Sequence, residues 1–208
     1  MTQEEIINFY SKYATQFNTK IGALTLYDNS YKEFVDAAPV KTNLLDLVCG
    51  PGNVSHFIQN LIPDLQISCV DLSQEMLELA KGKLKQAKFY KSDILNLDIP
   101  ENKYDLIVCA FGLPYVNRED IALFARQISN FAHPETSVYI SCMKGNSSQL
   151  ENVSFGENEK LLIHYHQRES LELAFQSEGF NVISYIEQDY PEQDGSISTD
   201  MIFVFSQY

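Results

Sequence analysis

The spacing of apolar residues changes at Pro39. Before it, apolar side chains recur every three or four positions, which predicts two helices within residues 1–40. After it, short continuous apolar runs alternate with amphipathic stretches, as in strands buried on both faces that are separated by helices. We predict strands over 43–49, 66–72, 88–93, 104–111 and 137–143, and helices over 54–62, 73–87, 119–132 and 168–178.

The end of the chain departs from this alternation. Two apolar runs, 181–186 and 199–205, are separated by a turn-forming segment over 191–196 and not by a helix, which predicts an antiparallel hairpin. A mostly parallel, seven-stranded sheet in a three-layer α/β sandwich follows, with helices on both faces. The polar segment 144–159 interrupts the pattern and is expected to be a loop or an inserted flap.

The length of 208 residues suits one hydrophobic core and leaves little room for a second. We therefore expect a single domain over 1–208, with a helical cap over 1–40 and a core over 41–208. We expect the flap to extend over 144–166.

Charge and cysteine content narrow the class of protein. A formal net charge of −13 disfavours nucleic acid and anionic membranes as partners. The start of the chain is acidic, unlike a secretory signal, and no apolar run is long enough to span a bilayer. The four cysteines are far apart and lie within apolar runs, which indicates buried free thiols and no metal site: Cys49, Cys69, Cys109 and Cys142. We expect a cytoplasmic protein.

The segment 44–55, LLDLVCGPGNVS, carries the strongest chemical signal. It combines a buried strand, a glycine turn and the start of a helix, which bring backbone N–H groups close to a ligand. Asp71 ends the next predicted strand 21 residues after Gly50, near the spacing of about 20 expected for an acid that binds ribose hydroxyls. Ser55 occupies the position of the third glycine of dinucleotide-binding turns, so we disfavour a nicotinamide or flavin cofactor.

These motifs resemble a known family. LLDLVCGPG and CVDLSQEMLELA are similar to the first two motifs of class I S-adenosylmethionine-dependent methyltransferases, and specifically to their small-molecule (type 11/25-like) branch. FYKSD, YDLIVCAFGLPYV and RESLELAFQSEGF match later motifs in the same order, so the resemblance covers most of the chain. It implies a Rossmann-like fold, S-adenosyl-L-methionine as the cofactor, and methyl transfer to a small molecule.

The resemblance also implies roles for individual residues along the cofactor. The methionine end would contact Asp46, Gly50 and Gly52, and the ribose would contact Asp71. The adenine would contact Leu72, Met76, Asp93 and Ile94. The reacting end would lie against Ala110 and Phe111, and a lid would be formed by Tyr10 and Tyr13. Each has a structural alternative: Asp71 and Asp93 as strand-end or cap residues, and the two tyrosines as helix-packing aromatics.

Val48 departs from the family pattern, because it stands where the family has its first glycine. A β-branched side chain at this position could narrow the cofactor pocket. This leaves open a catalytically inactive cofactor-binding or interaction scaffold of the same fold, as an alternative to the enzyme. A methyltransferase acting on protein or RNA is a second alternative.

Methyl transfer requires little catalytic machinery from the protein. The reaction is an in-line displacement at a sulfonium methyl, so the acceptor must be oriented and water excluded, and no catalytic triad is expected. A general base is needed only for an acceptor that must lose a proton. His164 and His166 are the candidates, with surface or structural roles as the alternative. If they lie on one strand, both imidazoles face the same side. The acceptor and the oligomeric state are not determined by the sequence.

Overall fold

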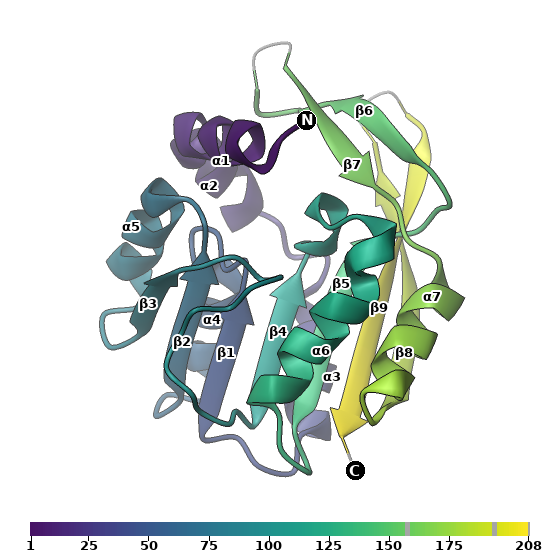
Figure 1. Ribbon diagram of the computed structural model, residues 1–208. Helices are drawn as coiled ribbons and strands as arrows, with labels where there is room; N and C mark the ends of the chain where they lie inside the picture. Colours follow the sequence, from purple (N-terminus) through teal and green to yellow (C-terminus); the bar gives the residue numbers. More distant parts are fainter. Residues whose placement is uncertain (157–158, 193–194, 208) are drawn as a thin grey trace.

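A seven-stranded sheet runs through the centre of the protein in the order β3-β2-β1-β4-β5-β9-β8 (Figure 1). This computed structural model describes residues 1–156, 159–192 and 195–207. The strands are β1 (Asn43–Leu47), β2 (Gln66–Asp71), β3 (Lys88–Lys91), β4 (Leu106–Ala110), β5 (Ser137–Met143), β8 (Phe180–Pro191) and β9 (Ile197–Gln207). The first five are parallel, and β9 is antiparallel to both β5 and β8. The predicted sheet with its closing hairpin is confirmed; residues 193–194 of the predicted turn lie outside the described residues.

Helices cover both faces of the sheet, which explains why its central strands are apolar throughout. Helices α3 (Asp28–Ala37), α4 (Asn53–Leu61) and α5 (Gln74–Lys83) bury their apolar sides on one face, and α6 (Ile121–Phe131) and α7 (Arg168–Ser177) on the other. Aromatic packing is close on the second face, where the rings of Phe175 and Phe205 stack with centroids 4.2 Å apart. All four cysteines are free and buried, as predicted.

Local signals account for several element ends. Ser73 caps α5 by accepting a hydrogen bond from the N–H of Met76 (3.2 Å). The helix stops at Lys83, earlier than predicted, because the chain must turn to enter β3 at Lys88. Gly179 follows α7 with φ of 85°, the left-handed conformation expected at a helix end.

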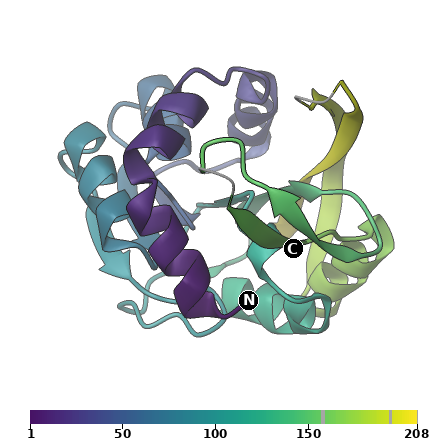
Figure 2. The same ribbon diagram turned by 90° about the horizontal axis from the view of Figure 1, so that it is seen from above.

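Three helices precede the sheet where two were predicted. The first predicted helix is divided at Tyr13 into α1 (Gln3–Lys12) and α2 (Ala14–Gly22), and α3 follows. Thr2 and Glu5 form a capping box that begins α1. Figure 2, the view from above, shows α1 and α2 lying across the end of the sheet at which β1, β2 and β4 finish.

The predicted flap contains a second, two-stranded sheet. Strands β6 (Ser148–Asn152) and β7 (Lys160–His164) pair antiparallel over the same end of the molecule (Figure 1). The sequence pattern missed these strands because β6 is mostly exposed and polar, and only Leu161 and Ile163 of β7 face a core. Residues 157–158 of the flap lie outside the described residues. Within the described ranges, no helix is long and apolar enough to cross a membrane.

Candidate functional site

A cavity of about 970 Å³ lies where the parallel strands end at their carboxyl termini. The chain leaves β1 toward α4 on one face of the sheet and leaves β4 toward α6 on the other, so the neighbours β1 and β4 form a topological switch point. Open α/β sheets bind ligands at such points. Helices α1 and α2 and the β6–β7 hairpin also contribute lining residues. All of the sequence-predicted cofactor contacts except Tyr13 and Gly52 line this cavity.

Asp71 connects the end of β2 to the glycine turn. Its Oδ2 accepts a hydrogen bond from the N–H of Gly50, and its Oδ1 accepts one from the N–H of Ser73, both at 2.8 Å. Burial raises the pKa of the Asp71 carboxyl, and these backbone donors act against that shift. The acid therefore faces the turn that the sequence analysis paired with it.

The two glycines of the turn have different roles. Gly50 has φ of 52° and lines the cavity. A Cβ added there would meet a single side chain, Phe17, at an ordinary contact distance. Gly52 has φ of 79°, and a Cβ there would lie 3.0 Å from the Cβ of Ala80. Gly52 thus permits close packing between α4 and α5 and does not reach the cavity.

Asp46 is a nearly fully buried acid at the same end of the cavity, with 1% of its surface exposed. The Ser55 hydroxyl donates to its Oδ2 at 2.5 Å. Burial raises the pKa of Asp46 to about 7, and the nearby charge of Asp71 contributes to the rise. Among the described residues no ion pair reaches this carboxyl.

A group of polar donors that the sequence analysis missed lies beside the glycine turn. The ammonium of Lys83 donates to the side-chain oxygens of Asn18 (2.6 Å) and Asn53. Burial lowers the pKa of Lys83. The Asn53 Nδ2 is buried and has no hydrogen-bond partner in the described part of the chain. A buried donor without a partner is unfavourable, so this amide is suited to an acceptor group on a ligand.

The predicted adenine side is apolar around one carboxylate. Met76 and Ile94 are buried and line the cavity. The Asp93 Oδ1 accepts from the N–H of Leu95 (2.9 Å), and its Oδ2 accepts from the side-chain amide of Gln3 (2.7 Å). Helix α1 therefore contacts the acid that the resemblance assigns to the adenine amino group.

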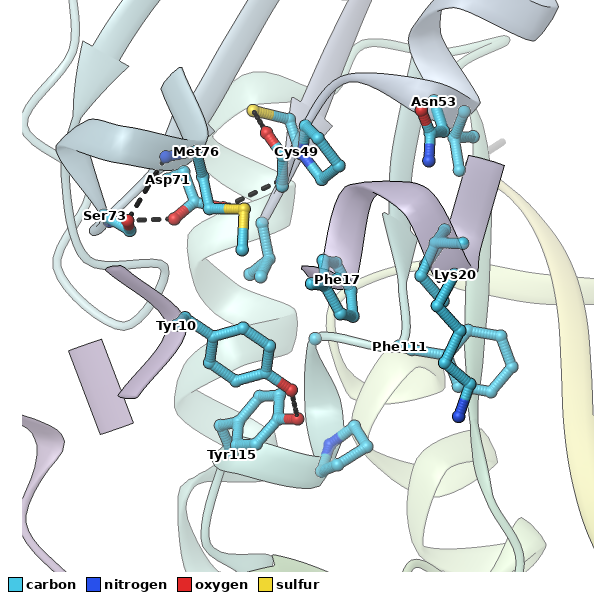
Figure 3. A pocket seen from close by; sticks show the side chains of 18 of the residues that line it. Tyr10, Phe17, Lys20, Cys49, Asn53, Asp71, Ser73, Met76, Phe111 and Tyr115 are labelled. Carbon is cyan, nitrogen blue, oxygen red and sulfur yellow. Dashed lines mark hydrogen bonds between the residues drawn. The ribbon is translucent and has the colours of Figure 1, made fainter. Parts of the chain in front are cut away.

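Aromatic side chains from α1, α2, the turn after β4 and the segment after β6 meet beside the glycine turn. The hydroxyls of Tyr10 and Tyr115 hydrogen-bond to each other and point toward one another in Figure 3. Phe17 lies 5.3 Å from Tyr10 and 5.0 Å from Phe155, centroid to centroid. A Cβ on Gly50 would be 3.6 Å from Phe17, so this ring covers the turn. Tyr115 and Phe17 were not predicted as site residues, since Phe17 follows an ordinary helical apolar pattern.

Tyr13 differs from Tyr10. It is buried against Phe9, with ring centroids 4.9 Å apart, and its hydroxyl donates to Glu159 at 2.9 Å. Tyr13 thus packs α1 against the segment before β7, in agreement with the helix-packing alternative.

Val48 and Phe111 follow β1 and β4 with left-handed backbones, at φ of 60° and 57°. Such conformations are uncommon for side chains of this kind and are often found at functional sites. The Val48 side chain lies over Gly112, where an added Cβ would be 2.9 Å from its Cγ2. Val48 lines the cavity without closing it.

The two candidate histidines are separated by the end of β7. His164 lines the cavity, and its Nδ1 is 2.8 Å from the Ser148 hydroxyl. His166 is buried, does not line the cavity, and places its Nε2 2.8 Å from the Leu113 carbonyl oxygen. Burial lowers the pKa of both imidazoles. Only His164 is placed to exchange a proton with a ligand.

Residues 44–135 match the family model described as a methyltransferase domain. A putative methyltransferase 235L of Invertebrate iridescent virus 6 is 29% identical over 113 residues, which are 53% of this chain and 42% of the viral protein. A demethylmenaquinone methyltransferase of Thermotoga maritima is 38% identical over 69 residues, 33% of this chain and 30% of that protein. The aligned regions span less than half the length of these relatives.

The fold also matches solved structures. An S-adenosylmethionine-dependent methyltransferase from Clostridium acetobutylicum superposes with a TM-score of 0.71 at 19% identity, covering 95% of this chain and 98% of the other. That likeness confirms the arrangement of helices and strands. Residues 44–135 therefore match a methyltransferase domain, and the described fold is the one seen in a solved S-adenosylmethionine-dependent methyltransferase.

Proposed function

We propose that the chain binds S-adenosyl-L-methionine in this cavity and transfers its methyl group to a small-molecule acceptor. The observation that carries the proposal is the pair of hydrogen bonds from Gly50 and Ser73 to Asp71, which holds the acid of β2 beside the glycine turn of β1. The relatives named demethylmenaquinone methyltransferase and trans-aconitate 2-methyltransferase support a small organic acceptor.

The residues present suit the two ends of the cofactor. The buried Asp46 carboxyl and the unpaired Asn53 amide offer an acceptor and a donor for the charged groups of an amino acid. Asp71 is placed for ribose hydroxyls, and Leu72, Met76 and Ile94 offer apolar surface for adenine. The cofactor supplies a methyl group already activated on a sulfonium.

The remaining work belongs to the residues around the reacting end. Phe111, Tyr10 and Phe17 restrict the space and exclude water. If the methyl acceptor must lose a proton, we propose that the Nε2 of His164 takes it. Burial lowers the pKa of this imidazole, so it is neutral at pH 7 and can bind a proton.

Compartment and domain organisation are part of the same proposal. The four free, buried thiols are consistent with a reducing, cytoplasmic environment. We treat residues 1–208 as one domain, because α1 and the hairpin share the cavity with the sheet.

Titration calorimetry with S-adenosylmethionine and S-adenosylhomocysteine tests the proposal. We expect binding with a micromolar Kd, and we expect Asp71→Asn to weaken it by about 10-fold or more, because one charge-assisted acceptor is lost. Asp64→Asn, the same change at an exposed turn before β2, is the control and should bind like the wild type. Absence of binding by the folded protein would favour the scaffold alternative. Unchanged affinity of Asp71→Asn would remove Asp71 from the ribose site.

A further inference from the structure

Asp200 is a buried acid that the proposed cofactor contacts leave unused. It lies near the start of β9, in register with Met143 of β5 and Gln188 of β8. Only 3% of its surface is exposed, and it lines the cavity. The Tyr27 hydroxyl donates to its Oδ2 at 2.6 Å. Across the described ranges, no hydrogen bond to its Oδ1 and no ion pair to this carboxyl is found.

Aromatic side chains connect this carboxyl with the cavity. Tyr27, which holds Asp200, packs against Phe111 with ring centroids 5.0 Å apart. Phe111 follows β4 and is the residue assigned to the reacting end. Tyr31 and Tyr190 line the same cavity. Asp200 is thus linked to the reacting end through a single aromatic ring.

The charge of the cavity wall is predominantly negative. Its described acidic residues are Asp28, Asp46, Asp71, Asp93, Glu151, Glu192 and Asp200, whereas Lys20 and Lys83 are its described lysines. Lys83 is engaged by two asparagines, and Lys20 donates to the Ser154 hydroxyl. Neither lysine forms an ion pair with Asp200.

A buried carboxylate without a cation is unfavourable unless a ligand provides the positive charge. The faces of tyrosine and phenylalanine rings attract cations as well. A buried acid in a cavity lined by aromatic residues therefore favours a cationic group as its ligand. An anionic acceptor would be repelled by the same wall.

We propose that Asp200, Tyr27, Phe111 and Tyr190 form an acceptor subsite for the ammonium group of an amine, which makes the chain an N-methyltransferase. This inference rests on the proposed function. The bound ammonium releases one proton to the base proposed above, the Nε2 of His164, and the freed nitrogen lone pair forms the N–C bond as the C–S bond of the cofactor breaks. The sulfonium becomes a neutral thioether, and the methylated amine retains the positive charge.

Three probes of one shape test the inference: tyramine, tyrosol and 4-hydroxyphenylacetate, which end in an ammonium, an alcohol and a carboxylate. Each is titrated by calorimetry into protein saturated with S-adenosylhomocysteine, and cyclohexylmethylamine with cyclohexylmethanol provides a second scaffold. We expect each amine to bind about 10-fold or more tighter than its alcohol, and the carboxylate to bind weakest. We also expect N-methyl product from the amines with S-adenosylmethionine.

Asp200→Asn removes the charge and retains an oxygen that can accept from Tyr27. It should bring amine and alcohol affinities within about 3-fold of each other and leave S-adenosylhomocysteine affinity unchanged. Asp64→Asn should retain the amine preference. Equal binding of amine and alcohol, absence of binding by both amines, or a preference that survives Asp200→Asn would overturn the subsite. Failure to bind S-adenosylhomocysteine would instead contradict the proposed function.

Discussion

Val48 and Gly112 form a contact pair between the ends of β1 and β4. Val48 has a left-handed backbone that a β-branched residue rarely adopts. Gly112 has φ of −82° and ψ of −31°, which any residue can adopt, so its backbone does not require glycine. The close packing requires glycine at this position, because a Cβ at Gly112 would meet the Val48 Cγ2 at 2.9 Å and the Cys109 Sγ at 2.6 Å. Gly112 therefore provides the space that the Val48 side chain occupies.

A double-mutant cycle on this pair tests the contact. We expect Gly112→Ala to lower the free energy of unfolding by about 1–3 kcal/mol in the wild type, through overpacking. In the Val48→Gly background, the loss of unfolding free energy caused by Gly112→Ala should be smaller by about 0.5 kcal/mol or more, since only the Cys109 contact remains. Urea denaturation measures both values. Equal losses in the two backgrounds would show that Val48 and Gly112 do not interact.

At the scale of elements, α1, α2 and the β6–β7 hairpin enclose the cavity through aromatic contacts. Phe155 follows β6 and lies within 5.0 to 5.8 Å of the rings of Phe9, Tyr10 and Phe17. The ion pair between these elements, Lys12 with Glu159, is exposed and contributes little. The aromatic contacts therefore hold the helices and the hairpin together.

Phe155→Ala should loosen this enclosure without unfolding the sheet. Loss of a partly buried aromatic side chain lowers the local opening free energy by about 1–2 kcal/mol. Amide hydrogen exchange in α1 and β7 should then be about 5- to 30-fold faster, while β4 and β5 remain protected. Leu150→Ala, on the exposed part of β6, is the matched control and should exchange as the wild type does. Faster exchange in both variants, or in neither, would contradict the assigned role of Phe155.

At the scale of the molecule, a net charge of −13 coexists with carboxyls buried beneath the cavity. Burial raises the pKa of Asp46 to about 7 and of Asp200 to about 6, both above the ordinary value of 3.8. Between the ordinary pKa and the raised pKa of each carboxyl, the folded protein therefore binds more protons than the unfolded chain does. These two carboxyls therefore make their full contribution to the stability of the unliganded protein below about pH 4, where they are protonated in both states. That contribution is lost as the pH rises through 6 to 7.

The Tm of the unliganded protein should accordingly fall between pH 5.5 and pH 8. Asp46→Asn keeps an oxygen that can accept from Ser55 but cannot ionise, so its Tm should fall less over the same interval. Scanning calorimetry at both pH values checks this, with Asp64→Asn expected to follow the wild type. An equally steep fall in Asp46→Asn would show that Asp46 does not carry the pH dependence.

The sequence by itself determined the sheet, its closing hairpin and the position of the glycine turn. Strands buried on both faces leave continuous apolar runs, and a turn with positive φ favours glycine, so both signals are local. The strong run at β4 and the acid at the end of β2 were readable for this reason. The division at Tyr13 and strand β6 were not, because an exposed or half-buried element shows weak periodicity.

Only the tertiary structure decided which side chains share the cavity. Phe17, Tyr115 and Asp200 come from α2, a turn after β4, and β9, and nothing in their local sequence distinguishes them from packing residues. Tyr10 and Tyr13 are three residues apart in sequence, yet only Tyr10 reaches the cavity, because the rotation of α1 turns Tyr13 toward the hairpin. Contacts between residues distant in sequence depend on how whole elements pack, and apolar periodicity identifies the buried side of an element without specifying its neighbour.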